Sequence, residues 1–312
     1  MTTTVSPARA EQAPPAAAPK RRRSSSGLAL LFLLPALIVF GLFVFWPLVR
    51  SVVLSFQGTD IIGRPGAFVG TANYERLLSD PGFVKVLGVT LAFTLLTVVP
   101  SILLALVVAL MLQSRIRAVR FFRTAFALPF AFSVATASVV FQVLYNPASG
   151  VLNGLLSHVG VGPVHWLTDP DIALFSVAGA TVWMQLGYNL LVLSAGLGAL
   201  PEEVIEAARL DGATGLRLQR SIVLPLITPQ LFFLVVTGTI HSLQSFGQIR
   251  ILTAGGPEGN TTTLVYSIYE QAFAYNNSNF GYASAQALVL LLIVLVITAV
   301  QFGILERKVF YR

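Results

Sequence analysis

Residues 201–229 read PEEVIEAARLDGATGLRLQRSIVLPLITP and separate two long apolar runs. Pro201 suits the start of a helix, and the two glutamates after it complement the positive end of the helix dipole. Apolar side chains from Val204 to Leu210 recur at helical spacing. Gly212 then predicts the stop, because glycine adopts the left-handed conformation without steric cost. The stretch therefore predicts a short amphipathic helix, a glycine turn and a second short, basic helix.

The composition is that of a membrane protein. Of 312 residues, 55% are hydrophobic and only 11% are charged, whereas soluble domains carry about a quarter charged residues. The chain has no cysteine, which excludes disulfides, zinc–thiolate sites and cysteine nucleophiles. Its net charge of +7 does not indicate nucleic-acid binding, because the positive residues follow the predicted membrane topology.

Six apolar runs predict an all-α membrane protein with six transmembrane helices. The first run is longer than the apolar core of a signal peptide and no cleavage site follows it, so we interpret it as an uncleaved span. Residues 1–26 predict a disordered basic tail, and residues 27–312 predict one six-span domain with a polar loop at 200–221. The predicted spans are 28–49, 84–112, 124–145, 172–199, 222–249 and 282–305.

The distribution of positive charge predicts the orientation. Six spans place both termini on one side of the membrane. Most of the 20 Lys and Arg residues fall on that side, among them the run 20–23 and the four arginines of the link 113–123. Because loops rich in Lys and Arg stay in the cytoplasm, we expect both termini and the loop 200–221 to be cytoplasmic.

The chain lacks the residues of an energy-converting or catalytic site. None of its lysines, Lys20, Lys85 and Lys308, follows a glycine, so a P-loop is excluded and any ATP must be hydrolysed by a partner. The interiors of the predicted spans carry no Asp, Glu, Lys or Arg, which weakens a stand-alone ion-coupled transporter. Backbone carbonyls can bind sodium, so that alternative stays open. We predict no catalytic residue, no metal site and no cofactor.

Uncharged polar side chains gather on two predicted spans. Their spacing of three or four residues places each set on one helix face, as a solute path requires. The alternative is that these groups bond neighbouring helices to one another, and His241 alone is more typical of a packed, hydrogen-bonded histidine. The candidate path residues are Gln185, Tyr188 and Asn189 in the fourth span, His241, Gln244 and Gln248 in the fifth, and Arg250 at its outer end.

The segments Glu206-Ala207-Ala208, Asp211-Gly212-Ala213 and Ile222-Val223-Leu224-Pro225 resemble the EAA loop of ABC importer membrane subunits. The resemblance implies a type I importer permease, with a cytoplasmic coupling helix between spans four and five. It also implies that this helix docks into a cleft of a separate ATPase subunit. The coupling residues carried over in this way are Glu206, Ala207, Ala208, Asp211, Gly212 and Ala213.

Further segments narrow the resemblance. Phe68-Val69-Gly70 and the run 252–257 are similar to carbohydrate-importer membrane subunits of bacteria. This implies an inner-membrane heterodimer with a second homologous permease, two ATPase subunits and an extracytoplasmic solute-binding protein. The run 261–269 and the segment 308–311 resemble the A-type membrane subunits of glycerol-3-phosphate importers. The implied solute is glycerol-3-phosphate or a glycerophosphodiester, with a neutral sugar or oligosaccharide as the alternative.

Overall fold

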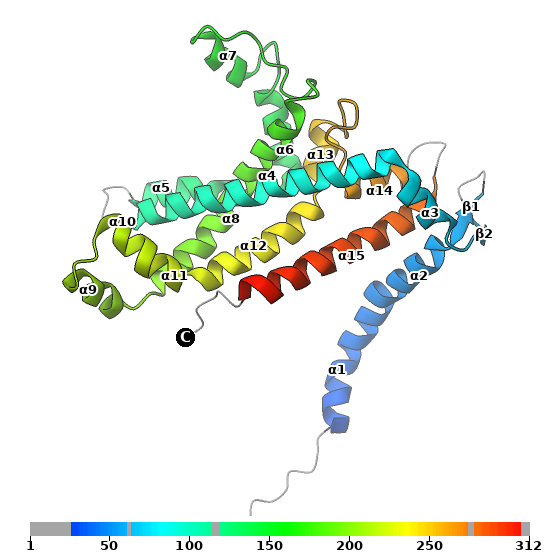
Figure 1. Ribbon diagram of the computed structural model, residues 1–312, viewed down its shortest axis with the longest axis horizontal. Coiled ribbons are helices and arrows are strands. Elements are labelled where there is room, and N and C mark those ends of the chain that lie inside the picture. Colours follow the sequence, from blue (N-terminus) through cyan, green and yellow to red (C-terminus); the bar gives the residue numbers. More distant parts are fainter. Residues whose placement is uncertain (1–25, 61–63, 114–118, 274–277, 307–312) are drawn as a thin grey trace, which may run out of the picture. The chain divides into compact units, whose positions relative to one another are not determined.

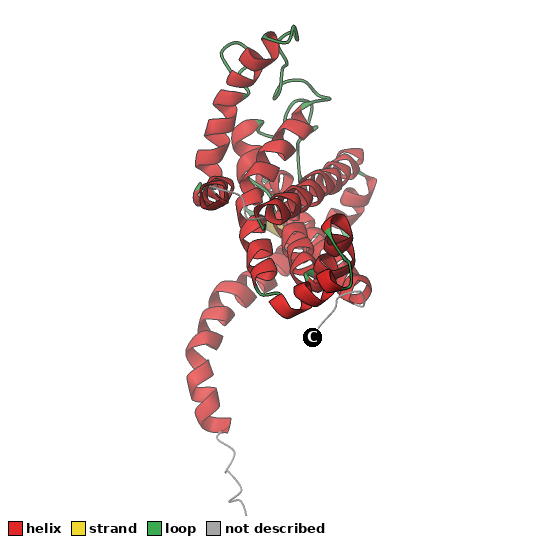
Figure 2. Cartoon of the chain, turned by 90° about the vertical axis from the view of Figure 1, so that its left-hand side faces the viewer, coloured by secondary structure: helices red, strands yellow, loops and turns green. Residues whose placement is uncertain are grey.

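The computed structural model describes residues 26–60, 64–113, 119–273 and 278–306, most of them helical (Figure 2). Residues 1–25 of the predicted tail, part of the link 113–123 and the segment 308–311 lie outside the described residues. The chain divides between Val49 and Arg50 into two compact units. The first unit holds α1 (Ser26–Phe40), the π-helix η1 (Gly41–Phe45) and the start of α2 (Trp46–Ser55).

The second unit is organised around α4 (Pro81–Leu112), which packs against α8 (Ala173–Gly198) and α12 (Thr228–Leu243) (Figure 1). Asp80 starts α4, since its carboxylate accepts a hydrogen bond from the Gly82 amide at 2.8 Å. Leu190, Leu193 and Leu234 are almost completely buried between these helices. The apolar faces of α4, α8 and α12 therefore form the core that positions the site.

Two of the six predicted spans are bent pairs of helices. The third consists of α5 (Val119–Ala127), the 3-10 turn η2 (Leu128–Ala131) and α6 (Val134–Leu144), bent by 104°. Pro129 lies in this turn and Phe132 is extended, so the helix restarts at Ser133, whose hydroxyl accepts from the Thr136 amide. The described residues hold four helices that could cross a membrane, or up to six if each bent pair is one span.

The fifth predicted span also differs from expectation. It consists of α11 (Leu224–Leu226) and α12, with a bend of 66° between Gly215–Leu226 and Thr228–Leu243. Pro225 and Pro229 flank this bend and remove helical hydrogen bonds. The helix then breaks after Leu243 and restarts as α13 (Gly247–Leu252), instead of running on to residue 249.

The helix–turn–helix predicted for residues 201–229 is present. α9 (Glu202–Leu210) starts one residue after Pro201, which occupies the N-cap, and Gly212 has a φ of +83° just beyond the helix. The short α10 (Gly215–Leu218) and the π-helix η3 (Gln219–Val223) follow and lead into α11.

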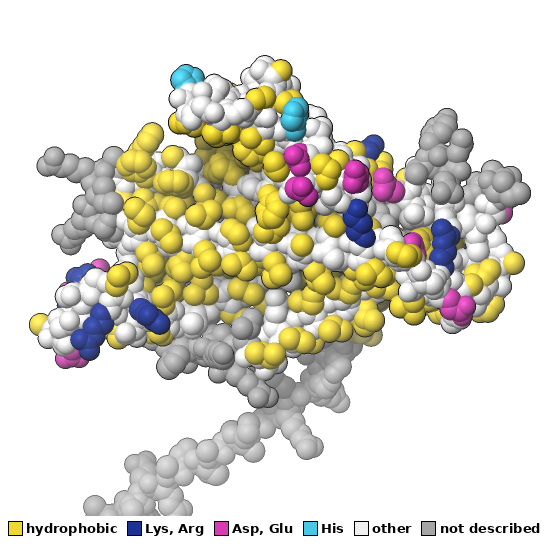
Figure 3. Space-filling model, turned by 45° about the horizontal axis from the view of Figure 1, so that its top comes forward, with side chains coloured by type: hydrophobic (Ala, Val, Ile, Leu, Met, Phe, Trp, Pro, Cys, Tyr) yellow, Lys and Arg dark blue, Asp and Glu magenta, His cyan; other side chains and the backbone are white. Residues whose placement is uncertain are grey.

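Of the remaining elements, α3 (Ala72–Ser79) and α14 (Leu264–Phe273) pack against α4 and α15 (Phe280–Leu305), whereas α7 (Val151–Ser157) packs against α6. Strands β1 (Gln57–Thr59) and β2 (Pro65–Phe68) form an antiparallel hairpin that contacts α15. Figure 3 shows a broad apolar surface on one face, with charged side chains at its margins.

Candidate functional site

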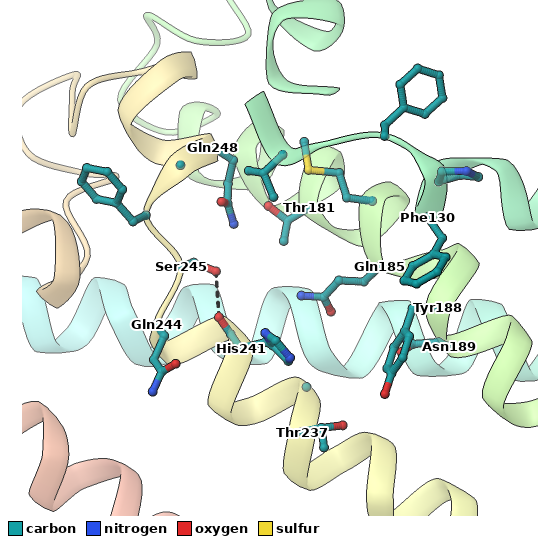
Figure 4. Close-up of a pocket in the computed structure, with 17 residues that line it drawn as sticks. Phe130, Thr181, Gln185, Tyr188, Asn189, Thr237, His241, Gln244, Ser245 and Gln248 are labelled. Carbon is teal, nitrogen blue, oxygen red and sulfur yellow. Dashed lines mark hydrogen bonds between the residues drawn. The ribbon is translucent and has the colours of Figure 1, made fainter. Parts of the chain in front are cut away.

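A cavity of about 610 Å³ lies between α8, α12 and the turn η2. Gln185, Tyr188 and Asn189 line it from α8, and His241 lines it from α12 (Figure 4). The break after Leu243 adds residues 244–248 to the same wall. All of the predicted path residues except Arg250 therefore line one cavity.

The cavity wall combines amides with an aromatic face. The Ser101 hydroxyl donates to Gln185 Oε1 at 3.3 Å and orients that amide from α4. The rings of Phe130 and Tyr188 lie 5.8 Å apart and line the same cavity. A solute rich in hydroxyl groups needs such donors and acceptors together with an apolar surface for its carbon skeleton.

His241 differs from the expectation for an isolated intramembrane histidine. Its side chain is exposed and lines the cavity, whereas the sequence favoured a packed residue. Two further side chains line the same wall, the exposed Gln244 of the linker and the half-buried Thr237 of α12. The spacing of these three residues places them on one face of the helix, so polar groups extend along the open side of the cavity.

Arg250 lies outside the cavity, on α13. Its Nη1 donates to the Tyr266 hydroxyl at 3.4 Å, and its guanidinium lies 5.4 Å from the centre of the Tyr269 ring. Phe246 joins this group to the cavity, because it lines the cavity and its ring lies 5.0 Å from that of Tyr269. Burial raises the pKa of the neighbouring Glu270 carboxyl, while the hydrogen bond from Tyr266 and the charge of Arg250 act in the opposite direction.

The predicted coupling residues separate into two groups. Glu206, Ala207, Asp211 and Gly212 are exposed, whereas Ala208 and Ala213 pack into the chain's own core. The methyl group of Ala208 is 8% exposed and packs against the chain itself, and the coupling role of these six residues stays a prediction.

Leu210 and Leu216, at 89% and 87% exposed, flank the glycine turn and were not expected on the outer face. In the sequence, the one indication of this exposure is that both leucines are apolar residues beside a polar turn. Exposed leucines of this kind commonly mark protein–protein contacts.

Comparison with known proteins identifies the family. Residues 82–311 match the model of the binding-protein-dependent transport system inner membrane component. The chain belongs to this family. The bent spans, the cavity and the exposed turn at Gly212 are therefore features of a permease of this family.

The permease has relatives along most of its length. It is 38% identical over 280 residues to the sn-glycerol-3-phosphate transport system permease protein of Agrobacterium fabrum, covering 89% of this chain and 94% of that one. It is 37% identical over 270 residues to a probable ABC transporter permease protein of Pyrococcus horikoshii, covering 86% and 92%. These matches include all of the cavity residues.

The permease fold is also that of a solved structure. A chain of a bacterial alginate ABC transporter in complex with an alginate pentasaccharide-bound periplasmic protein superposes with a TM-score of 0.77. That superposition covers 90% of this permease and 95% of the alginate transporter chain at 23% sequence identity. At this identity the likeness concerns the fold.

Proposed function

We propose that this permease forms half of the translocation path of an ABC importer for glycerol-3-phosphate or a glycerophosphodiester. The cavity between α8, α12 and η2 carries the proposal, because it gathers the polar residues that the sequence marked as a path. The relatives named as sn-glycerol-3-phosphate permeases support the choice of solute. ATP is hydrolysed on a partner subunit, since the sequence has no P-loop.

A second permease subunit completes the path. His241 and Gln244 are exposed along one wall of the cavity, beside the half-buried Thr237, at the depth of a predicted span. Polar groups at that depth need protein or water over them, because lipid cannot satisfy them. A second, homologous permease packed on this side encloses the cavity and makes the functional unit a heterodimer in the bacterial inner membrane.

The loop around Gly212 transmits the movement of the ATPase subunits. Glu206, Ala207 and Asp211 form its exposed surface, with Leu210 and Leu216 beside them, so these residues meet the ATPase cleft at the cytoplasmic face. Ala208 and Ala213 have a different role and fix α9 against the core. Both termini are cytoplasmic in this arrangement, and an extracytoplasmic solute-binding protein delivers the solute from the other side.

Arg250 supplies a positive charge at the outer end of the path. In proteoliposomes that contain the permease, its genomic partner subunits and the cognate binding protein, we expect ATP-dependent uptake of radiolabelled glycerol-3-phosphate. Arg250→Gln should lower uptake at subsaturating solute roughly ten- to a hundredfold, since a charge-assisted hydrogen bond contributes about 1.5–3 kcal/mol. Arg64→Gln, which removes an exposed arginine of the β1–β2 hairpin, is the matched control.

The outcomes separate the alternatives. If maltose-like sugars are taken up and glycerol-3-phosphate is not, the phosphate ester is rejected as the solute, while the assignment as an importer subunit stands. Solute uptake by this chain with no ATPase present would reject the importer and favour a stand-alone transporter. Equal uptake by Arg250→Gln and Arg64→Gln would remove Arg250 from the path.

Gln185 tests the cavity itself. Gln185→Leu removes an amide that Ser101 orients toward the cavity, so we expect the KM for uptake to rise about tenfold or less, by the loss of about 1 kcal/mol. Gln301→Leu is the control. The Gln301 side chain on α15 donates from Nε2 to the Thr239 Oγ1 atom of α12 at 3.0 Å, and it does not line the cavity. A KM that changes equally in both variants would mean that Gln185 only holds helices together.

A further inference from the structure

A second cavity, of about 440 Å³, lies behind the coupling helix. It is enclosed by α9, by α10 with η3, and by the end of α4, and it shares no lining residue with the first cavity. Leu218 and Val223 form its apolar floor and are 6% and 1% exposed. Its mouth is polar. The lining residues are Leu110, Gln113, Ile205, Arg209, Thr214, Gly215, Leu218, Gln219 and Val223.

Two polar groups of this cavity, one on Gln219 and one on Arg209, are available to a ligand. The Gln219 Oε1 atom is buried and accepts no hydrogen bond from the described residues. A buried carbonyl without a donor is unfavourable, so the site favours a hydroxyl or ammonium group there. Arg209 is the charged side chain among the described lining residues, and none of them is acidic. The Arg209 guanidinium therefore favours an anion.

We propose that this cavity binds a phosphate ester that carries a free hydroxyl group, such as a glycerol phosphate. The phosphate pairs with Arg209, a hydroxyl donates to Gln219 Oε1, and the carbon chain covers Leu218 and Val223. Two sources supply this chemistry, a free glycerol phosphate and the headgroup of phosphatidylglycerol. Inorganic phosphate offers the charge without a carbon chain, so it binds more weakly.

Occupancy of the cavity regulates transport. The ligand contacts α9 through Arg209 and η3 through Gln219, so it ties the coupling helix to the start of the next span. A helix held in this way moves less when the ATPase subunits close. This regulatory consequence rests on the proposed function, whereas the binding itself does not.

Binding is tested on the full-length chain, with the subunits that co-purify, in phosphatidylcholine nanodiscs. Gln185→Leu serves as the common background, so that binding in the first cavity is weakened equally in every variant compared. Equilibrium dialysis with radiolabelled glycerol-3-phosphate should show saturable binding that Arg209→Gln and Gln219→Leu each weaken about tenfold. Arg217→Gln is the matched control, because Arg217 is exposed on α10 and does not line the cavity.

A lipid arm distinguishes the two sources. The same variants are placed in nanodiscs that contain phosphatidylglycerol and are examined by native mass spectrometry. If the lipid is the occupant, it stays bound to Arg217→Gln, is lost from Arg209→Gln and displaces the soluble ester. If the free ester is the occupant, phosphatidylglycerol leaves its binding unchanged, and ester loaded on the cytoplasmic side slows uptake unless Arg209 is replaced.

Equal behaviour of Arg209→Gln, Gln219→Leu and Arg217→Gln toward both probes would overturn the proposal and leave a cavity filled with water. Uptake of glycerol-3-phosphate would survive that result, so the proposed function would stand. Conversely, if the phosphate ester binds in the second cavity but no ATP-driven uptake is measured, the proposed function is rejected and the binding site in this cavity stands.

Discussion

Replacement of Gly212 by proline is expected to leave membrane insertion intact and to reduce ATP-driven uptake roughly a hundredfold. The residue has a φ of +83°, whereas proline is fixed near −65° and has no amide hydrogen. The Gly212 amide donates to the Arg209 carbonyl at 3.0 Å, and this bond would be lost. An incompatible proline costs about 3 kcal/mol, which corresponds to roughly a hundredfold fewer chains with the native turn.

Gly212→Asn is the control that isolates the backbone. No atom lies within 4 Å of a Cβ atom at residue 212, so an added side chain meets no obstacle. Asparagine tolerates the left-handed conformation, and most of the uptake should remain. The measurement compares ATP hydrolysis with solute uptake in proteoliposomes. Full uptake by Gly212→Pro would contradict the role of this turn in coupling.

Replacement of Gly187 by alanine is expected to destabilise the permease by about 1–3 kcal/mol, through overpacking. A Cβ atom at this position would lie 2.7 Å from the Ala127 carbonyl oxygen and 2.8 Å from the Phe130 amide nitrogen. These are backbone atoms, so η2 must move away from α8. Because Pro129 and Phe130 line the first cavity from that turn, uptake should fall together with stability.

The matched control is Gly198→Ala in the same helix. No atom outside its own helix lies within 4 Å of a Cβ atom there, and alanine favours helix, so stability should stay unchanged or rise slightly. Thermal unfolding of the purified chain and uptake in proteoliposomes are measured for both variants. If the two variants unfold at the same temperature, η2 does not depend on close contact with Gly187.

The sequence predicted the regular helices well, because length and hydropathy decide them. α4, α8 and α15 extend to within a few residues of the expected bounds. Pro201 and Gly212 likewise predicted the limits of α9 within one residue. The angles of the bends were not predicted, since a proline such as Pro129 shows where a helix weakens but not the angle that packing then selects.

The same limit applies to the site. Helical spacing placed Gln185 and Asn189 on one face, but it could not show that this face meets His241 from another helix. Arg250 was extrapolated along a continuous fifth span. The break after Leu243 instead places it on α13 beside Tyr266. The direction of Ala208 depends on tertiary contacts of α9, which the amphipathic pattern did not resolve.

The bend between η2 and α6 has a consequence for biogenesis. α6 has 11 residues, which at 1.5 Å per residue span about 16 Å, roughly half of the hydrocarbon core of a bilayer. A segment this short cannot leave the translocon alone as a stable span. Its packing partners are α13 and, to a smaller extent, α8, and both follow it in the chain. Stable insertion of α6 therefore waits for synthesis of α8 and α13, and a ribosome stalled before these helices are made should expose α6 to quality-control proteases.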